Sequence, residues 1–160
     1  MTREELKQGI ASISHQLIAN SHQPIIEFEE TGEFLNVIIP SAILLPIMQQ
    51  LRTDKQYDFD YLFCLTCVDW KEHFMMVYHL FSKTHKHTLV VKGKITDQVN
   101  PEIETVSHIW KTADYLEREV YDLFGVNFLH HPDLRRLFLE DGWEGFPLRK
   151  DYVDKNMIVL

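Results

Sequence analysis

Two cysteines, Cys64 and Cys67, have the C-x-x-C spacing of redox pairs and of half of a zinc site. The residues around them follow a strand pattern, in which side chains three positions apart point to opposite faces. The chain has no second cysteine pair to complete a tetrahedral site. The motif therefore indicates two small buried side chains. A metal- or redox-active protein that uses these cysteines with histidines stays open as an alternative.

The nine histidines could also bind metal. His85 and His87 form an H-x-H motif in a polar joint between two predicted strands, and His130 and His131 are adjacent. No H-E-x-x-H motif is present. The pattern favours solvated or locally hydrogen-bonded histidines. Pro132 favours an extended backbone at His131, and His131 is the histidine that we retain as a candidate.

One predicted helix has charged residues at a regular spacing. Asp114, Arg118 and Asp122 lie four residues apart on one face, and Glu117 and Glu119 flank the arginine. In one interpretation this is a solvated face whose ion pairs each contribute about 0.5 kcal/mol or less. In the other, these side chains bind the segment that follows or a partner protein.

The segment after Gly125 has little helix or strand periodicity, yet it combines basic residues with large apolar ones. Arginine, tryptophan and tyrosine are enriched at interface hot spots. We therefore predict an α+β domain at residues 1–125 and an extended partner-docking arm at residues 126–160. A disordered tail and an arm folded back over its own sheet are the alternatives. The residues that suggest docking are Arg135, Arg136, Trp143, Arg149, Lys150 and Tyr152.

Composition narrows the class of protein. The 160 residues suit one domain, and 45% hydrophobic and 25% charged residues are typical of a globular protein. A net charge of −8 argues against a nucleic-acid-binding protein. No apolar run approaches the roughly 20 residues of a membrane-spanning helix, and the N-terminus does not resemble a signal peptide. We expect membrane association only through partners.

No nucleophile elbow, Walker loop or dinucleotide-binding motif is present. We therefore predict no catalytic, cofactor-binding or metal-ligating residue in this chain.

The element order predicts an α+β fold with helices packed on a mixed or antiparallel sheet. The short polar joints after residues 70 and 81 predict three antiparallel strands. Both faces of the middle strand are apolar, so we expect it to be central, with cover on each side. The order predicted is a helix to about Ala19, strands at 25–28 and 34–39, a helix at 45–51, strands at 59–70, 74–81 and 88–95, a short helix at 100–106, a helix at 114–124 and the arm.

Three blocks of the C-terminal part resemble a known family. They are LEREVYDLFGV at residues 116–126, HPDLRRL at 131–137 and WEGFPLRKDY at 143–152. Their order and spacing resemble the signature of the 30-kDa subunit of respiratory complex I, which in bacteria is the C subunit of NADH-quinone oxidoreductase. LTCVDW at 65–70 and VYHLFS at 77–82 also resemble the sheet of this family.

The resemblance implies a subunit in the hydrophilic arm of the complex, beside the 49-kDa-type subunit, on the cytoplasmic side of the bacterial inner membrane. It implies electron transfer from NADH to quinone coupled to ion translocation, with NADH, FMN, iron–sulfur clusters and quinone on or between other subunits. Two cysteines are too few for the four thiolates of a cluster. The equivalent subunit of a membrane-bound hydrogenase-type complex is the alternative.

Two departures from the family pattern are visible. His130 stands where glycine is usual, so a turn with positive φ would be costly there. Phe146 stands where histidine is usual, so no polar contact is expected at that site. Residue by residue, the resemblance implies docking roles for Glu117, Arg118, Glu119, Asp122, His131, Arg135, Arg136, Arg149, Lys150 and Asp151.

Overall fold

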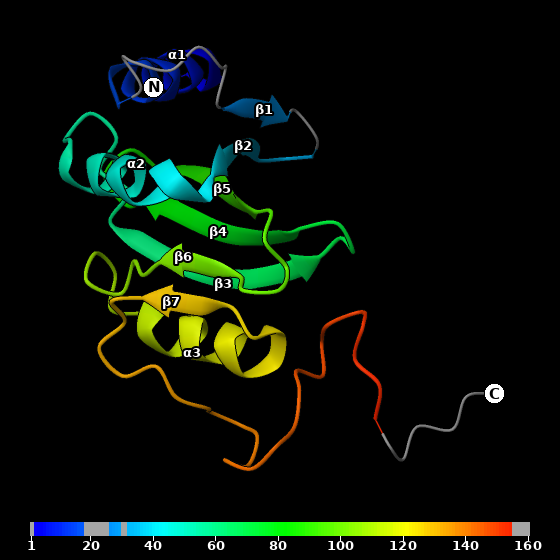
Figure 1. Ribbon diagram of the computed structural model, residues 1–160. Coiled ribbons are helices and arrows are strands. Elements are labelled where there is room, and N and C mark those ends of the chain that lie inside the picture. Colours follow the sequence, from blue (N-terminus) through cyan, green and yellow to red (C-terminus); the bar gives the residue numbers. More distant parts are fainter. Residues whose placement is uncertain (1, 18–25, 30–31, 155–160) are drawn as a thin grey trace.

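The computed structural model describes residues 2–17, 26–29 and 32–154 and has the predicted α+β fold (Figure 1). The predicted end of the first helix near Ala19 and the predicted strand start at Ile25 lie outside these residues. No helix of the described chain is long and apolar enough to cross a membrane. The elements are α1 (Arg3–Leu17), β1 (Glu27–Glu29), β2 (Leu35–Pro40), α2 (Ser41–Thr53), β3 (Tyr61–Asp69), β4 (Phe74–Ser82), β5 (His87–Ile95), β6 (Glu102–Glu104), α3 (Ala113–Phe124) and β7 (Asn127–Leu129).

The main sheet has the strand order β1-β2-β5-β4-β3. The predicted antiparallel meander of β3, β4 and β5 is confirmed, and β4 is central in it. Strand β2 pairs in parallel with β5, and α2 begins the connection between them. Such a parallel pair needs a long crossover, whereas hairpins need only a short joint.

One face of the main sheet forms the core. On β4 it presents Phe74, Met76, Tyr78 and Leu80, all buried. Buried residues of α1, α2 and α3 belong to the same apolar cluster. On β5, Gly93 lets Leu44 of α2 and Ile103 of β6 approach closely. The three helices and β6 therefore cover this face.

The predicted short helix at residues 100–106 is wrong. Residues 102–104 form β6, which pairs in parallel with β7. The pairing provides hydrogen-bond partners for the backbone of this segment. Polar and apolar residues alternate along it, with Ile103 buried between Glu102 and Glu104. This period of two is a strand signal, but the partner strand lies beyond α3.

Helix α3 ends as predicted. Gly125 adopts the left-handed conformation, with φ of 74°, and its N–H donates to the carbonyl of Tyr121. Val126 and then Phe128 of β7 follow at once, and both lie in the core. The first four residues of the predicted arm thus belong to the body of the domain. From His130 to Asp154 the arm has neither helix nor strand and runs along the outer side of α3 in Figure 1.

Candidate functional site

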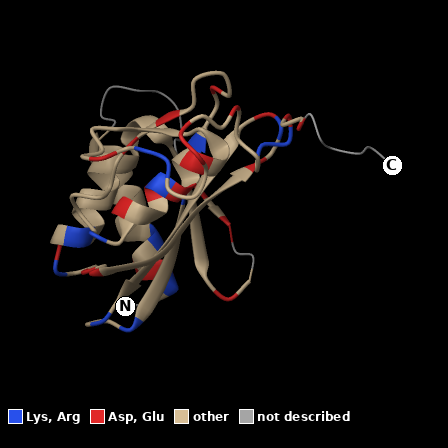
Figure 2. Ribbon diagram, turned by 90° about the horizontal axis from the view of Figure 1, so that it is seen from below, with Lys and Arg blue, Asp and Glu red and all other residues tan. Residues whose placement is uncertain are grey.

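The charged face of α3 points at the arm rather than into solvent. Glu117, Arg118 and Asp122 are all buried, on a helix whose Val120 and Phe124 pack into the core. Figure 2 shows positive and negative residues interspersed in this part of the molecule rather than separated into two faces. Buried charges need partners, and the arm supplies most of them.

Asp122 holds the middle of the arm. Its Oδ2 accepts hydrogen bonds from the backbone N–H groups of Leu137, Phe138 and Leu139 at 2.7–3.1 Å. Its Oδ1 accepts one from Arg136 at 2.9 Å. Burial opposes the charge of Asp122, but these donors outweigh it and lower the pKa of the carboxyl. The carboxylate therefore fixes three successive backbone amides with one oxygen.

Arg118 binds the same stretch from the next turn of α3. Its guanidinium donates to the carbonyls of Arg135 and Arg136, each at 3.3 Å. Its Nη1 lies 4.0 Å from the carboxylate of Asp133. The guanidinium of Arg118 also lies over the ring of Tyr115. A guanidinium has several donors in a fixed plane, so one side chain can bind two carbonyls. These contacts agree with the interpretation in which the charged side chains of α3 bind the segment that follows the helix.

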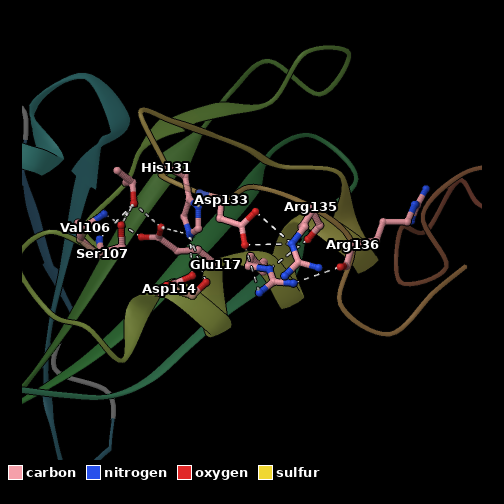
Figure 3. Close-up of polar contacts among 10 residues, drawn as sticks. Val106, Ser107, Asp114, Glu117, His131, Asp133, Arg135 and Arg136 are labelled. Carbon is pink, nitrogen blue, oxygen red and sulfur yellow. Dashed lines mark hydrogen bonds and ion pairs between the residues drawn. The ribbon is translucent and has the colours of Figure 1, made fainter. Parts of the chain in front are cut away.

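His131, at the start of the arm, lies beside the buried Glu117 of α3 (Figure 3). Glu117 is fully buried, and its carboxylate accepts hydrogen bonds from the N–H of Val106, at 2.8 Å, and from the hydroxyl of Thr105. His131 Nε2 lies 3.7 Å from Glu117 and 3.5 Å from Asp114. Burial raises the pKa of Glu117 to about 7, although both hydrogen bonds oppose the shift.

The backbone indicates the tautomer of neutral His131. Its Nδ1 lies 3.1 Å from the N–H of Asp133, so this nitrogen is the acceptor. The proton of the neutral ring then sits on Nε2, which lies 3.2 Å from the carbonyl of Asp114. His131 thus joins α3 to the arm through both ring nitrogens.

The end of the arm attaches near the edge strand. The N–H of Lys150 donates to Asp69 at 2.8 Å, and the N–H of Leu148 donates to the carbonyl of Leu123 at 3.0 Å. Arg149 donates to the carbonyl of Gln98 at 2.9 Å. These contacts place the arm across α3 and the end of β3.

Not all of the predicted docking residues face outward. Arg136 donates to the carbonyl of Trp143 at 2.9 Å, and Arg149 pairs with Asp151 at 3.1 Å. The side chain of Arg135 is 68% exposed. The placement of the others is as follows: Glu119 and Tyr152 are half-buried, and Trp143, Lys150 and Asp151 are exposed. Their docking roles stay predictions.

The arm turns large apolar side chains to solvent. Phe138 is 67% exposed and Leu148 is 52% exposed, with Trp143 and Val153 exposed as well. The arm is attached to α3 by hydrogen bonds of its backbone, to Asp122 and Leu123, and not by burial of these apolar side chains. These four side chains are not buried on the sheet, as they would be if the arm folded back over it.

Both departures from the family pattern have a structural counterpart. His130 does adopt a positive φ, of 63°, and its Nδ1 lies 2.8 Å from Glu104. The ring of Phe146 packs on Gly125, where an added Cβ would lie 2.5 Å from a ring carbon. The guanidinium of Arg136 also lies over this ring, 5.3 Å from its centre.

Cysteine and histidine do not form a metal site in the part of the chain that the structure describes. No group of three or more histidine, cysteine or acidic side chains there could hold an ion. Cys67 is buried and Cys64 is half-buried. Burial raises the pKa of the Cys67 thiol to about 12, which keeps it protonated and unreactive.

Asp69 belongs to the site although its sequence context did not reveal it. This buried carboxylate accepts hydrogen bonds from the N–H groups of Lys71 and Lys150, and these outweigh burial and lower its pKa. Lys150 lies 81 positions away, so no local pattern links the two. The only local signal is an acidic residue at an inward position of a strand that alternates between buried and exposed side chains.

Comparison with known proteins gives consistent results. A family model described as "Respiratory-chain NADH dehydrogenase, 30 Kd subunit" matches residues 37–156. The C subunit of NADH-quinone oxidoreductase from Geobacter sulfurreducens is 40% identical over 134 residues, which cover 80% of each chain. The C/D subunit of NADH-quinone oxidoreductase from Phocaeicola vulgatus is 48% identical over 115 residues, 71% of this chain but 22% of that protein. This chain spans less than half the length of several such relatives.

A solved structure has a similar fold. It comes from an archaeal respiratory membrane complex, the membrane-bound sulfane sulfur reductase, and aligns with a TM-score of 0.65 at 28% identity. The alignment covers 89% of this chain and 84% of the other chain.

Proposed function

Because the chain belongs to the family of the 30-kDa subunit of the respiratory-chain NADH dehydrogenase, we propose that it docks to the 49-kDa-type subunit of a membrane-associated NADH:quinone oxidoreductase. In this role it supports electron transfer from NADH to quinone coupled to ion translocation. It contributes no active site. NADH, FMN, iron–sulfur clusters and quinone bind on or between other subunits, and the chain lies on the cytoplasmic side of the membrane, attached through its partners.

The exposed apolar side chains of the arm are the observation that supports docking most directly. Phe138 and Leu148 stand out from a backbone that Asp122 and Leu123 hold in place. A segment held in this way is ordered before binding, so docking costs less conformational entropy than it would for a flexible tail. Exposed aromatic groups on an ordered backbone are typical of an interface.

The test is a pull-down with the 49-kDa-type subunit. The double variant Phe138→Ala with Leu148→Ala should keep its circular dichroism spectrum and lose affinity by about 30-fold, the effect of a hot spot of about 2 kcal/mol. Leu17→Ala is the matched control, because Leu17 is also exposed but lies on α1. Equal binding by the double variant and the wild type would refute docking through the arm.

A charge variant tests the same surface. Arg135→Ala should weaken docking, because its guanidinium is exposed on the arm and pairs with Asp133 of the same exposed stretch. Arg52→Ala removes a half-exposed arginine that pairs with Asp58, and it should leave docking unchanged. If both arginine variants bind alike, Arg135 has no docking role.

A second candidate is the equivalent subunit of a related membrane-bound complex, of the hydrogenase type among others. The fold similarity to a chain of the archaeal sulfane sulfur reductase complex favours it. Mass spectrometry of the chains that co-purify from native membranes separates the candidates. Flavin- and NADH-binding subunits would support the first proposal, and a nickel-ligating subunit would support the second.

A further inference from the structure

Exposed large apolar side chains gather on a second surface of the described chain, distinct from the arm. It is the face of the main sheet opposite the helices, which we call the open face. On β4 it presents the buried Met75 and the half-buried Val77, His79 and Phe81. On β3 it presents the exposed Val68, which is paired with Met75. An antiparallel sheet that faces water normally has polar residues on that side. On β4 the open face is mostly apolar instead, whereas β5 contributes Lys92 and Lys94.

Aromatic rings cover one end of the open face. His79 lies 5.5 Å from the ring of Phe63 and 6.3 Å from the ring of Phe34, centre to centre. Tyr61 lies beside Phe63, and all three aromatic residues are at least 36% exposed. A soluble domain rarely exposes so many contiguous rings unless they bind something.

The other end of the open face is a groove of about 870 Å³. Its aliphatic floor includes Ile38, Val68 and Val77, and Ile43 at the start of α2 closes one side. Trp70, 58% exposed, also lines it. The side chain of Lys150, from the arm, lies 6.0 Å from the Trp70 ring. The open face is therefore continuous with the arm.

Two lysines of β5 give the groove a charge pattern. Lys92 pairs with Glu29 of β1 at 2.5 Å. Lys94 is exposed between Pro40 and Met75, and no hydrogen bond or ion pair of its side chain is found in residues 2–17, 26–29 and 32–154. Glu27 of β1, also exposed, lines the same groove. An apolar floor with an exposed cation at Lys94 fits a partner that has an apolar stripe and a carboxylate.

We propose that the open face binds an amphipathic α-helix of another subunit, with its apolar stripe on the sheet and an acidic residue opposite Lys94. This rests on the proposed function, which supplies a multi-subunit assembly. A helix is the element that covers a sheet face without needing a free strand edge. Charge opposite Lys94 sets its register, and the apolar stripe supplies most of its affinity.

Site-specific photo-cross-linking in the native complex tests this proposal. We place p-benzoyl-phenylalanine at Val77, in the centre of the open face, and separately at the exposed Trp70, in case the first replacement disturbs folding. Leu17 on α1 is the control position. The expected product is a peptide of another subunit whose apolar residues repeat at helical spacing and which includes Asp or Glu. Lys94→Glu should lower the cross-link yield by about tenfold through like-charge repulsion, while Lys86→Glu at the β4–β5 turn should not.

Other products overturn the proposal. These are cross-links only to this chain, to a second copy or to a peptide without helical spacing, no cross-link at all, or a yield that Lys94→Glu leaves unchanged. Co-purification separates this failure from that of the proposed function. If the wild-type chain co-purifies with the complex but the open face gives no cross-link to another subunit, only this inference fails. If the wild-type chain does not co-purify, both fail.

Discussion

At the scale of single residues, Asp122 has the most hydrogen-bond donors in the site. Hydrogen bonds to a charged group contribute about 1.5–3 kcal/mol each. Asp122→Asn keeps the shape but removes the charge and turns an amide toward some of the donors. We expect the amides of Leu137, Phe138 and Leu139 to exchange hydrogen about 30-fold faster, since opening the arm becomes easier by about 2 kcal/mol. Hydrogen exchange followed by mass spectrometry or NMR measures this.

The matched control is Asp133→Asn on the same arm. Asp133 pairs with Arg135 where both side chains are more than half exposed, and it lies 4.0 Å from Arg118; pairs this exposed or this long contribute little to stability. Exchange at residues 137–139 should therefore hardly change. Equal protection in the Asp122 variant and the wild type would mean that Asp122 does not hold the arm.

Glu117 makes stability depend on pH. Its pKa is about 7 in the folded chain, against an ordinary value of 4.5. Between these values the folded chain binds more protons than the unfolded chain, so the free energy of unfolding falls as pH rises from about 4.5 to about 7. The full loss is about 3 kcal/mol. Glu117→Gln cannot ionise, so its denaturation curves should lack this decrease.

Two histidines oppose Glu117 in the same pH range. Burial lowers the pKa of His79 and of His87, so both favour folding as pH rises toward 6.5. They are present in wild type and variant alike, so the difference between the two proteins isolates Glu117. Urea denaturation at pH 5, 6, 7 and 8 gives this difference. A difference that stays constant over this range would contradict the role of Glu117.

At the scale of elements, the turn from α3 into β7 depends on a glycine. Gly125 has φ of 74°, and a Cβ there would lie 2.5 Å from the ring of Phe146. Gly125→Ala should lower the free energy of unfolding by about 2 kcal/mol or more, of which the left-handed backbone accounts for about 1–2 kcal/mol. Chemical denaturation monitored by circular dichroism measures it.

Gly142 offers a control within the arm. A Cβ there would meet nothing within 4 Å. Gly142→Ala should therefore change the free energy of unfolding by less than about 0.5 kcal/mol. If the two alanine variants are equally stable, Phe146 does not pack on the end of α3.

At the scale of the whole molecule, the arm and the sheet should open separately. Strand β4 is paired on both sides along its length, whereas the arm is held at separate points by Asp69, Leu123 and Asp122. Amides of residues 137–150 should exchange through a local opening with weak urea dependence, and those of β4 only through global unfolding. Hydrogen exchange at increasing urea measures both. Identical urea dependence would show that arm and sheet form one cooperative unit.

Local chemistry explains which parts of the fold could be predicted. Short polar joints determine hairpins, so the β3–β4–β5 meander followed from the sequence. Gly125 could be recognised as a helix end because few other residues accept its backbone conformation. The β6–β7 pair could not be predicted, since it joins segments on either side of α3. The division into a domain and a docking arm, with the docking roles of the site residues, stays a prediction.

The sequence by itself determined the α+β class, the central strand with two apolar faces, and a charged α3 followed by a segment rich in arginine and aromatic residues. These properties depend on residue type and on spacings of a few positions. Only the tertiary structure decided that Arg118 and Asp122 are buried against the arm and Glu117 against residues 105–106. It also decided that Asp69 holds Lys150 and that apolar groups such as Phe138 on the arm and Phe63 on the open face remain exposed. Each of these features depends on contacts between residues that are distant in sequence. The burial of a charged group, and the partner that compensates it, arise only when those segments pack together in the folded chain.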